Sequence, residues 1–170
     1  MVGGFRIMRA LFVGRFQPFH NGHLRVIEEI HKEFPDITVV ICGPSRPDEK
    51  NPFTFQERRE MIERVLGSRG IHFIIHEIED VNDDEKWAAE ISKLGEFDAA
   101  YSRNPWTIRC VKKAGIEVRS HGFYARSKNS GTQIRKNMLE GKEWKQFVPE
   151  EVYEYIDEIK HIERLGSVSL

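Results

Sequence analysis

The feature that most constrains the fold of this 170-residue chain is its alternation of short apolar runs with longer amphipathic segments. Short apolar runs bounded by glycine, proline or polar residues are typical of strands buried in a parallel sheet. The segments between them carry apolar residues at helical spacing. Such repeated units favour right-handed crossovers, so we expect an α/β fold: a doubly wound, Rossmann-like parallel sheet of about five strands with helices on both faces. The expected strands are Ala10–Val13, Ile37–Cys42, Ile71–Ile78, Ala99–Ser102 and Ile116–Ser120.

Capping residues mark several helix starts. Thr54 and Glu57 form a capping box, which predicts a helix that ends near Leu66. Proline is favoured at the first position of a helix, which predicts another helix beginning at Pro105. The remaining expected helices are Leu24–Phe34, one capped by Asn82 or Asp83 that runs through Trp87 to Leu94, one beginning at Ser130, and a C-terminal helix over about 149–164.

The length fits one domain, which we expect to span residues 1–170 with the C-terminal helix packed on it. Met8 is a second candidate start, which would make residues 1–7 an N-terminal extension. Cys42 and Cys110 have no metal-type spacing, so we expect them to be reduced core thiols of a cytoplasmic protein. We expect no signal peptide and no membrane span, because no segment approaches the ~20 apolar residues that cross a bilayer.

The formal net charge of −1 argues against a general nucleic-acid binder, which carries a basic excess. Any anion site must therefore be local. The segment Gly14–His23 (GRFQPFHNGH) is the best candidate. It lies at the carboxyl end of an expected strand, where ligands bind in open α/β sheets, and the free N–H groups of the next helix attract anions there. Arg15 and two histidines add donors, so this segment predicts a phosphate site.

His20 and His23 are three positions apart, so both rings can point the same way from a first helical turn, with Asn21 as a plausible N-cap. Gly22 lets a ligand or backbone approach closely, and Pro18 stiffens the turn. A lone histidine near a helix start is more often a solvated or capping residue than a catalytic one. The pair favours a functional role.

A second informative segment runs from Ser130 to Arg135 (SGTQIR). Ser130 and Gln133 form a capping box, so the N–H groups and hydroxyls of Ser130, Gly131 and Thr132 face outward at a helix start. Alone, this pattern is typical of an ordinary capped helix. Together with Gly14–His23 it predicts the other half of an anion site, with Arg135 one turn into the helix.

Gly14–His23 resembles the G-x-F-x-P-x-H-x-G-H signature of the nucleotidylyltransferase superfamily, whose members transfer a nucleotidyl group from a nucleoside triphosphate. Ser130–Arg135 resembles the second signature of that superfamily, which holds the triphosphate tail. Further matches are similar to the archaeal type of nicotinamide-mononucleotide (NMN) adenylyltransferase, over Met8 to about Leu165. These matches are Val13–Phe19, Asn51–Thr54 with Glu57 and Arg58, Asp80 with Trp87, Asn104–Pro105, and Phe123–Tyr124.

The resemblance implies adenylyl transfer from ATP to NMN, giving NAD⁺ and pyrophosphate, with His20, His23, Arg15 and Arg135 as catalytic residues. Mg²⁺ held mainly through the ATP phosphates is the implied cofactor, and we expect no protein metal site. The loop after the second strand departs from the family, so Lys50 or Arg46 takes its basic role. The implied ATP-binding residues are Gly14, Arg15, Phe16, His20, Gly22, His23, Lys50, Ser130, Gly131, Thr132 and Arg135.

For the acceptor, the resemblance implies that Trp87 stacks on the pyridinium ring, although a tryptophan on a helix is as often a packing residue. Asp80 is expected to hold the carboxamide or balance the ring charge. Asn104, Phe123 and Tyr124 are second-rank candidates for the substrate pocket. Asp84 stands where the family often has asparagine, which leaves base recognition open.

Two alternatives remain open at this point. One is a related transferase that uses CTP, or that accepts flavin mononucleotide, nicotinate mononucleotide or phosphopantetheine. The other is a nucleotide sensor that binds ATP without turnover. The expected partners are ATP and NMN, without nucleic acid or membrane, and the resemblance implies a homo-oligomer.

Overall fold

The computed structural model describes residues 5–121 and 130–167. Its centre is a five-stranded parallel sheet in the order β3-β2-β1-β4-β5, as the apolar runs predicted. The elements in chain order are β1 (Arg9–Gly14), α1 (Asn21–Glu33), β2 (Asp36–Gly43), α2 (Phe55–Ser68), β3 (Phe73–Glu79), α3 (Asp84–Lys93), β4 (Ala99–Tyr101), α4 (Pro105–Lys113), β5 (Val118–Arg119), α5 (Gly131–Leu139), a 3₁₀ turn η1 (Lys145–Phe147), α6 (Glu150–Glu158) and α7 (His161–Ser167).

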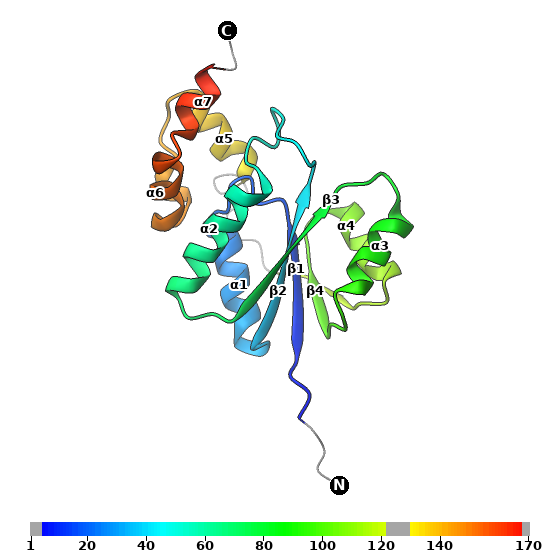
Figure 1. The fold of residues 1–170 in the computed structure, drawn as a ribbon. Coiled ribbons are helices and arrows are strands. Elements are labelled where there is room, and N and C mark those ends of the chain that lie inside the picture. Colours follow the sequence, from blue (N-terminus) through cyan, green and yellow to red (C-terminus); the bar gives the residue numbers. More distant parts are fainter. Residues whose placement is uncertain (1–4, 122–129, 168–170) are drawn as a thin grey trace.

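Helices cover both faces of the sheet: α1 and α2 lie on one, and α3 and α4 on the other (Figure 1). The side chains of β1 alternate between them, as a strand buried on both sides requires. Ala10 and Phe12 join the cluster under α1 and α2, whereas Leu11 and Val13 join the cluster under α3 and α4. The chain is therefore doubly wound.

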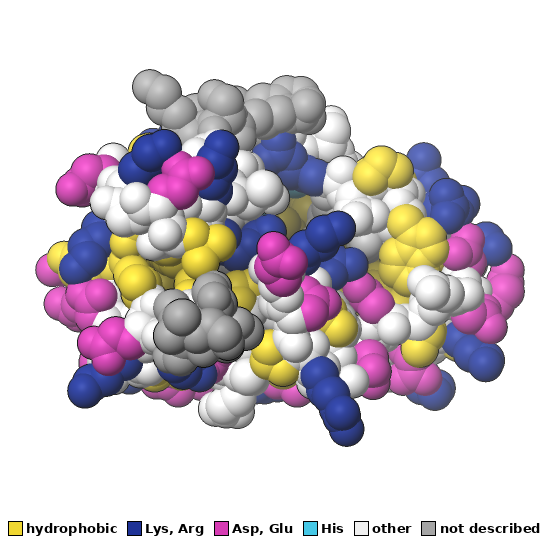
Figure 2. Space-filling model, turned by 90° about the horizontal axis from the view of Figure 1, so that it is seen from above, with side chains coloured by type: hydrophobic (Ala, Val, Ile, Leu, Met, Phe, Trp, Pro, Cys, Tyr) yellow, Lys and Arg dark blue, Asp and Glu magenta, His cyan; other side chains and the backbone are white. Residues whose placement is uncertain are grey.

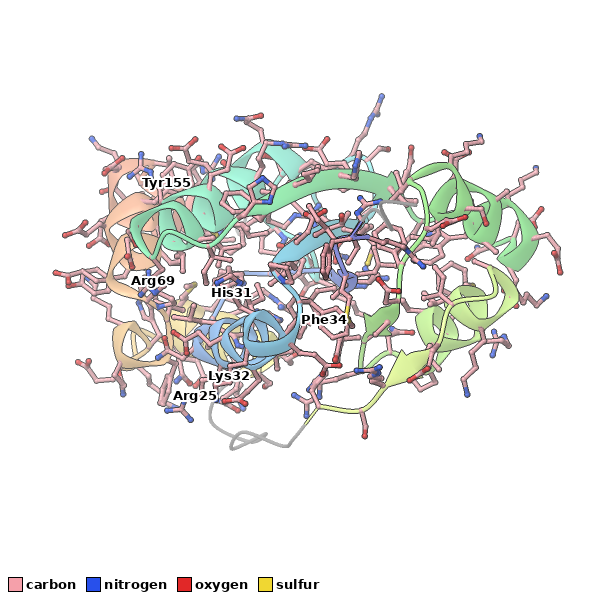
Figure 3. All side chains as sticks on the ribbon, turned by 90° about the horizontal axis from the view of Figure 1, so that it is seen from below. Arg25, His31, Lys32, Phe34, Arg69 and Tyr155 are labelled. Carbon is pink, nitrogen blue, oxygen red and sulfur yellow. The ribbon has the colours of Figure 1, made fainter. Side chains whose placement is uncertain are left out.

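The C-terminal helices extend the first cluster. Ile134 of α5 and Val152 of α6 are fully buried in it. Seen from below, Arg69 and Tyr155 lie on the side of the molecule where α2 meets α6 (Figure 3). There the Arg69 guanidinium pairs with Glu151 at 2.7 Å. Packing on α2 thus joins the C-terminal segment to the sheet.

The structure differs from four local predictions. The C-terminal segment forms two helices, because Lys160 adopts a left-handed φ of 51° between them. The N-cap of α1 is His20, and Asn21 is its first residue. The Gln133 side chain donates to Asn137 at 2.8 Å, so only the Ser130 half of that capping box forms. The outer strands are also shorter than expected, with β3 starting at Phe73 and β5 reduced to two residues.

The strand order reverses at β1, which pairs with β2 on one side and β4 on the other. In doubly wound sheets, ligands bind at the carboxyl ends of the strands beside this reversal. Lysine and arginine side chains gather around a hollow in the middle of this end of the molecule (Figure 2). Within the described part of the chain, every helix is too short or too polar to cross a bilayer.

Candidate active site

His20 and His23 cap the first turn of α1 reciprocally. The His20 Nδ1 accepts hydrogen bonds from the backbone N–H groups of Gly22 (3.1 Å) and His23 (3.4 Å). The His23 Nδ1 accepts from the backbone N–H of His20 at 3.1 Å. The two rings stack with their centroids 3.6 Å apart. The pair therefore points the same way, as its spacing predicted, and the rings form a single rigid unit.

This capping fixes the tautomers. Since each Nδ1 is an acceptor, each neutral ring carries its proton on Nε2. Burial, followed by the charge of Arg103, lowers the pKa of His20 to about 3. Burial, followed by the neighbouring His20, holds the pKa of His23 well below its usual value. Both rings are neutral at pH 7 and offer an Nε2–H donor rather than a proton to transfer.

A cavity of about 400 Å³ lies between the first turn of α1 and the start of α5. It brings together the two segments that the sequence paired. Three cations and no carboxylate are among the residues that line it, so it is suited to a polyanion. Lys50 borders this cavity and Arg46 does not, which favours Lys50 of the two candidates. The lining residues are Arg15, Phe16, Gln17, His20, His23, Lys50, Asn51, Gly131, Thr132 and Arg135.

Arg135 is tied to the first motif by its guanidinium. Its Nη1 donates to the Gln17 carbonyl at 2.6 Å. A Cβ on Gly131 would lie 2.9 Å from the same carbonyl oxygen and 3.1 Å from Arg135 Nη1, so only glycine permits this approach. The Gln17 side chain in turn exchanges two 2.9 Å hydrogen bonds with the backbone of Phe53. The two halves of the cavity are thus locked together through backbone atoms.

Arg58 supports the motif from below. Its Nη1 donates to the carbonyl oxygens of Arg15 and Cys42, both at 2.7 Å, and its Nε donates to Thr54 at 3.2 Å. The side chain is 1% exposed. Burial lowers the pKa of Arg58 to about 10, which leaves it charged at pH 7. This buried cation joins the ends of β1 and β2 and adds positive charge beneath the first cavity.

A second cavity of about 250 Å³ opens on the other side of the histidine pair, between β1 and the start of α4. It shares Arg15, His20 and His23 with the first cavity. Asp80 lines it, and its Oδ2 accepts from Arg15 Nη2. Gly14, Gly22 and Asn104 also border it, and the Asn104 Oδ1 caps α4.

Trp87 lines neither cavity in the described structure, and its expected stacking role stays a prediction. Its side chain is fully buried in the cluster under α3 and α4. Trp106 borders the second cavity instead. Asp84, the residue that left base recognition open, accepts from the Trp106 Nε1 at 2.7 Å and from the Arg109 Nε at 2.9 Å. Phe123 and Tyr124 lie outside the described residues.

Sequence reasoning placed Asn51 and Arg58 among the matches to the family but gave them no role in the site, and it missed Trp106. Asn51 lines the first cavity, and its Oδ1 accepts from Arg15 Nη1 at 2.9 Å. A polar residue directly before the Pro52–Thr54 turn was an available signal for Asn51. Arg58, four residues after the Thr54 cap, reads as a solvated helix residue. Trp87 and Trp106 both lie on expected helices, and helical spacing alone does not show which of the two borders a cavity and which belongs to the core.

The residues of the first cavity fit a magnesium ion that arrives with a nucleotide. The side-chain oxygens of its lining residues are the Gln17 and Asn51 amide oxygens and the Thr132 hydroxyl, and the Gln17 oxygen already accepts from the Phe53 N–H. Within residues 5–121 and 130–167 no cluster of three or more His, Cys, Asp or Glu side chains is arranged to hold a metal. Magnesium retains several waters and binds phosphate oxygens readily, so this donor set suits it.

Comparisons with known proteins agree with this geometry. Residues 11–150 match the cytidylyltransferase-like family. The nicotinamide-nucleotide adenylyltransferase of Methanocorpusculum labreanum is 41% identical over 163 residues, which cover 95% of this chain and 97% of the relative. That of Archaeoglobus fulgidus is 39% identical over 171 residues, covering 95% and 98%.

A crystal structure of a bifunctional NMN adenylyltransferase/ADP ribose pyrophosphatase from Francisella tularensis has the same fold, with a TM-score of 0.75 at 24% identity. The match covers 89% of this chain and 50% of the other, so this chain spans half of that bifunctional protein. The chain therefore belongs to the cytidylyltransferase-like family, among the nucleotidyltransferases related to the archaeal nicotinamide-nucleotide adenylyltransferases.

Proposed function

We propose that the protein transfers the adenylyl group of ATP to the 5′-phosphate of NMN, forming NAD⁺ and pyrophosphate. One observation carries the proposal: a cationic cavity and a smaller cavity, lined by both apolar and polar residues, meet at Arg15, His20 and His23. The first suits a triphosphate and the second a small ring with a polar substituent. Their junction is where the α-phosphorus of ATP would meet the acceptor. The curated relatives carry this activity in their names.

The reaction needs alignment more than a base. An oxygen of the NMN 5′-phosphate attacks the α-phosphorus in line, the bond from that phosphorus to the bridging oxygen breaks, and pyrophosphate leaves. No covalent intermediate on the protein is required. The attacking phosphate is already anionic, because the second pKa of a phosphate ester is ~6. The reaction then needs hydrogen-bond donors to the phosphates rather than a base. His20 and His23 suit this need, because their lowered pKa values keep both rings neutral and leave their N–H groups as donors.

We assign the contacts with the ATP phosphates as follows. The His20 and His23 Nε2–H groups donate to the α-phosphate and to the leaving β-phosphate. Arg15 and Arg135 clamp the phosphate oxygens on either side by charge-assisted hydrogen bonds. The start of α5, with Ser130 as its N-cap, presents backbone N–H groups to the tail. Magnesium carried by ATP would neutralise part of the charge on the phosphates, which repel one another.

Pyrophosphate release tests the proposal. The protein is incubated with Mg²⁺ and either ATP or CTP, against NMN, nicotinate mononucleotide, flavin mononucleotide and phosphopantetheine. We expect the highest kcat/KM with ATP and NMN. A preference for CTP or for another acceptor would overturn the assigned substrates. Nucleotide binding without pyrophosphate release from any pair would instead indicate a sensor.

We also propose, on the resemblance alone, a homo-oligomeric assembly and a cytoplasmic location. Sedimentation velocity on the full chain tests the first proposal, with a species several times the 19.9 kDa of one chain as the expected result. A single species at the mass of one chain would contradict it.

A further inference from the structure

The loop between β2 and α2 closes into a tight turn beside the first cavity, and Asp48 begins that turn. The backbones of Asp48 and Asn51 exchange two hydrogen bonds, at 3.1 and 3.2 Å. The Asp48 Oδ1 accepts from the backbone N–H groups of Lys50 at 2.8 Å and of Asn51 at 2.7 Å. Lys50 and Asn51 line the first cavity, whereas Asp48 lies outside it. One carboxylate therefore fixes the backbone of two residues that line the cavity.

The Asn51 side chain connects this carboxylate to Arg15. Its Nδ2 donates to the Asp48 Oδ1 at 3.0 Å and to the Oδ2 at 3.2 Å. Its Oδ1 accepts from the Arg15 Nη1 at 2.9 Å. A carboxylate only accepts and a guanidinium only donates, so a reversed amide would lose the hydrogen bonds to both neighbours. The orientation of the Asn51 amide is therefore set from both sides.

The charge of Asp48 opposes the binding of a polyanion. The Asn51 side chain, followed by the Asn51 backbone N–H, holds the pKa of Asp48 below its usual value, so the carboxylate is ionised at pH 7. Burial lowers the pKa of Arg135, and the Asp48 charge partly opposes that shift, so the field of Asp48 reaches the first cavity. Such a field repels phosphate. Any benefit of Asp48 to a bound polyanion therefore comes from the geometry it imposes.

We propose that Asp48 is a positioning residue for the triphosphate, which orients the Asn51 amide and through it the Arg15 guanidinium. This inference rests on the proposed function for the identity of the polyanion. Asp48 touches no substrate and acts through its neighbours in the turn. A guanidinium that is already held by a neutral amide loses less conformational freedom when it binds phosphate, and it keeps its charge.

Two substitutions of Asp48 separate geometry from charge. Asp48→Ala and Asp48→Asn both remove the charge, but only Asp48→Asn retains an oxygen acceptor for the N–H groups of Lys50 and Asn51. The probe is inorganic tripolyphosphate with Mg²⁺, titrated calorimetrically into the full chain. We expect the Kd to rise at least about fivefold in Asp48→Ala and to stay at or below the wild-type value in Asp48→Asn. If Asp48→Ala binds as tightly as Asp48→Asn, the inference is overturned.

Asn51→Ala tests the link to Arg15. We expect it to weaken tripolyphosphate binding, and the double variant with Asp48→Ala to lose less than the product of the two single losses, because both act on one guanidinium. Fully multiplicative losses would overturn the link. Glu49→Ala, in the same turn but outside the first cavity, is the matched control and should change the Kd less than about twofold. A loss in Glu49→Ala equal to that in Asp48→Ala would mean that any change in this turn disturbs the cavity, and it would also overturn the inference.

Steady-state kinetics connects the binding series to the reaction. We expect the KM for ATP to rise at least about fivefold in Asp48→Ala and to return to near the wild-type value in Asp48→Asn. Failure of the wild-type protein to form NAD⁺ would count against the proposed function, while the tripolyphosphate series would still decide whether Asp48 positions the cavity. NAD⁺ formation with the same KM for ATP in Asp48→Ala as in the wild-type protein would count against this inference alone.

Discussion

Arg15 and Asp80, 65 positions apart in the sequence, form an ion pair at the junction of the two cavities, with Nη2 and Oδ2 separated by 2.5 Å. The arginine that is proposed to hold the ATP phosphates is therefore engaged by a carboxylate of the second cavity. A triphosphate bound as proposed would compete for the same guanidinium. Any interaction of ATP with Arg15 consequently changes what Asp80 offers to the acceptor, and this coupling must be reciprocal.

Asp80→Asn should shift the two substrate affinities in opposite directions. Freeing Arg15 should strengthen ATP binding by up to about fivefold, because a half-exposed ion pair contributes ~0.2–1 kcal/mol. NMN binding should weaken, because the carboxylate that faces its ring is lost. Calorimetric titration of each substrate checks both signs. Asp36→Asn, at the other end of the sheet, is the control and should change neither affinity. Weakening of both affinities would contradict the coupling.

His23→Ala should lower kcat about 10²–10³-fold, with a much smaller effect on ATP binding, because a donor aimed at developing charge acts mainly in the transition state. Steady-state kinetics and equilibrium ATP binding measure the two quantities. Asn21→Ala in the same turn is the matched control, since its side chain donates to the Gln146 carbonyl on the surface. A rise in KM with unchanged kcat would refute the assigned role.

Arg58→Met should destabilise the fold by about 2–4 kcal/mol, because it leaves the Arg15 and Cys42 carbonyl oxygens without their buried donor. Urea unfolding measures this change in the free energy of unfolding. Arg59→Met, one position along α2, should cost less than about 1 kcal/mol, since Arg59 makes partly exposed ion pairs with Glu63 and Glu77 and one long hydrogen bond of 3.5 Å to the Ile75 carbonyl. Equal losses in both variants would mean that Arg58 acts as ordinary surface charge.

Stability should fall as the pH drops from 7 to 5. Burial lowers the pKa of His20 to about 3 and that of His161 to about 4, and it lowers the pKa of His23 as well. Unfolding returns these groups to a pKa near 6.5, so the unfolded chain binds more protons below that pH. Each group can then contribute up to ~1.4 kcal/mol per pH unit, present above pH 6.5 and lost toward the folded pKa.

Urea unfolding of the wild-type protein and of His161→Gln across this pH range checks the sign. His161 stacks on Phe53 outside the two cavities, so its removal should flatten the slope without touching the site. Stability that stays constant or rises on acidification would show that the histidines are not held neutral.

The fold could be predicted because its information is local. Ala10–Val13 is apolar on both faces, which indicates a central parallel strand, and Thr54 with Glu57 forms the expected capping box in the structure. Errors arose where a residue takes a structural role that another residue type usually fills. Histidine is an unusual N-cap, so Asn21 was preferred, although His20 Nδ1 accepts the same backbone donors. The break between α6 and α7 has Lys160, rather than a glycine, in the left-handed conformation, so the sequence carries no usual signal for a helix end there.

The site was only partly readable for a different reason. The first cavity is lined mainly by the two short segments that the sequence paired, which bring Arg15 and Arg135 together. Lys50, one of two candidates that the resemblance left open, lies beside them. The acceptor half depends on how α3 packs against α4. Which of two tryptophans reaches the cavity is decided by that packing, and helical periodicity alone cannot supply it.

The central claim is adenylyl transfer to NMN by direct attack, and one labelling experiment tests it most directly. ATP radiolabelled on the α-phosphorus is incubated with NMN, Mg²⁺ and the protein, and the products are separated from the protein. The account predicts that the label passes to NAD⁺ in step with pyrophosphate release, with none bound to the protein. Label trapped on the protein, or pyrophosphate released without labelled NAD⁺, would contradict it.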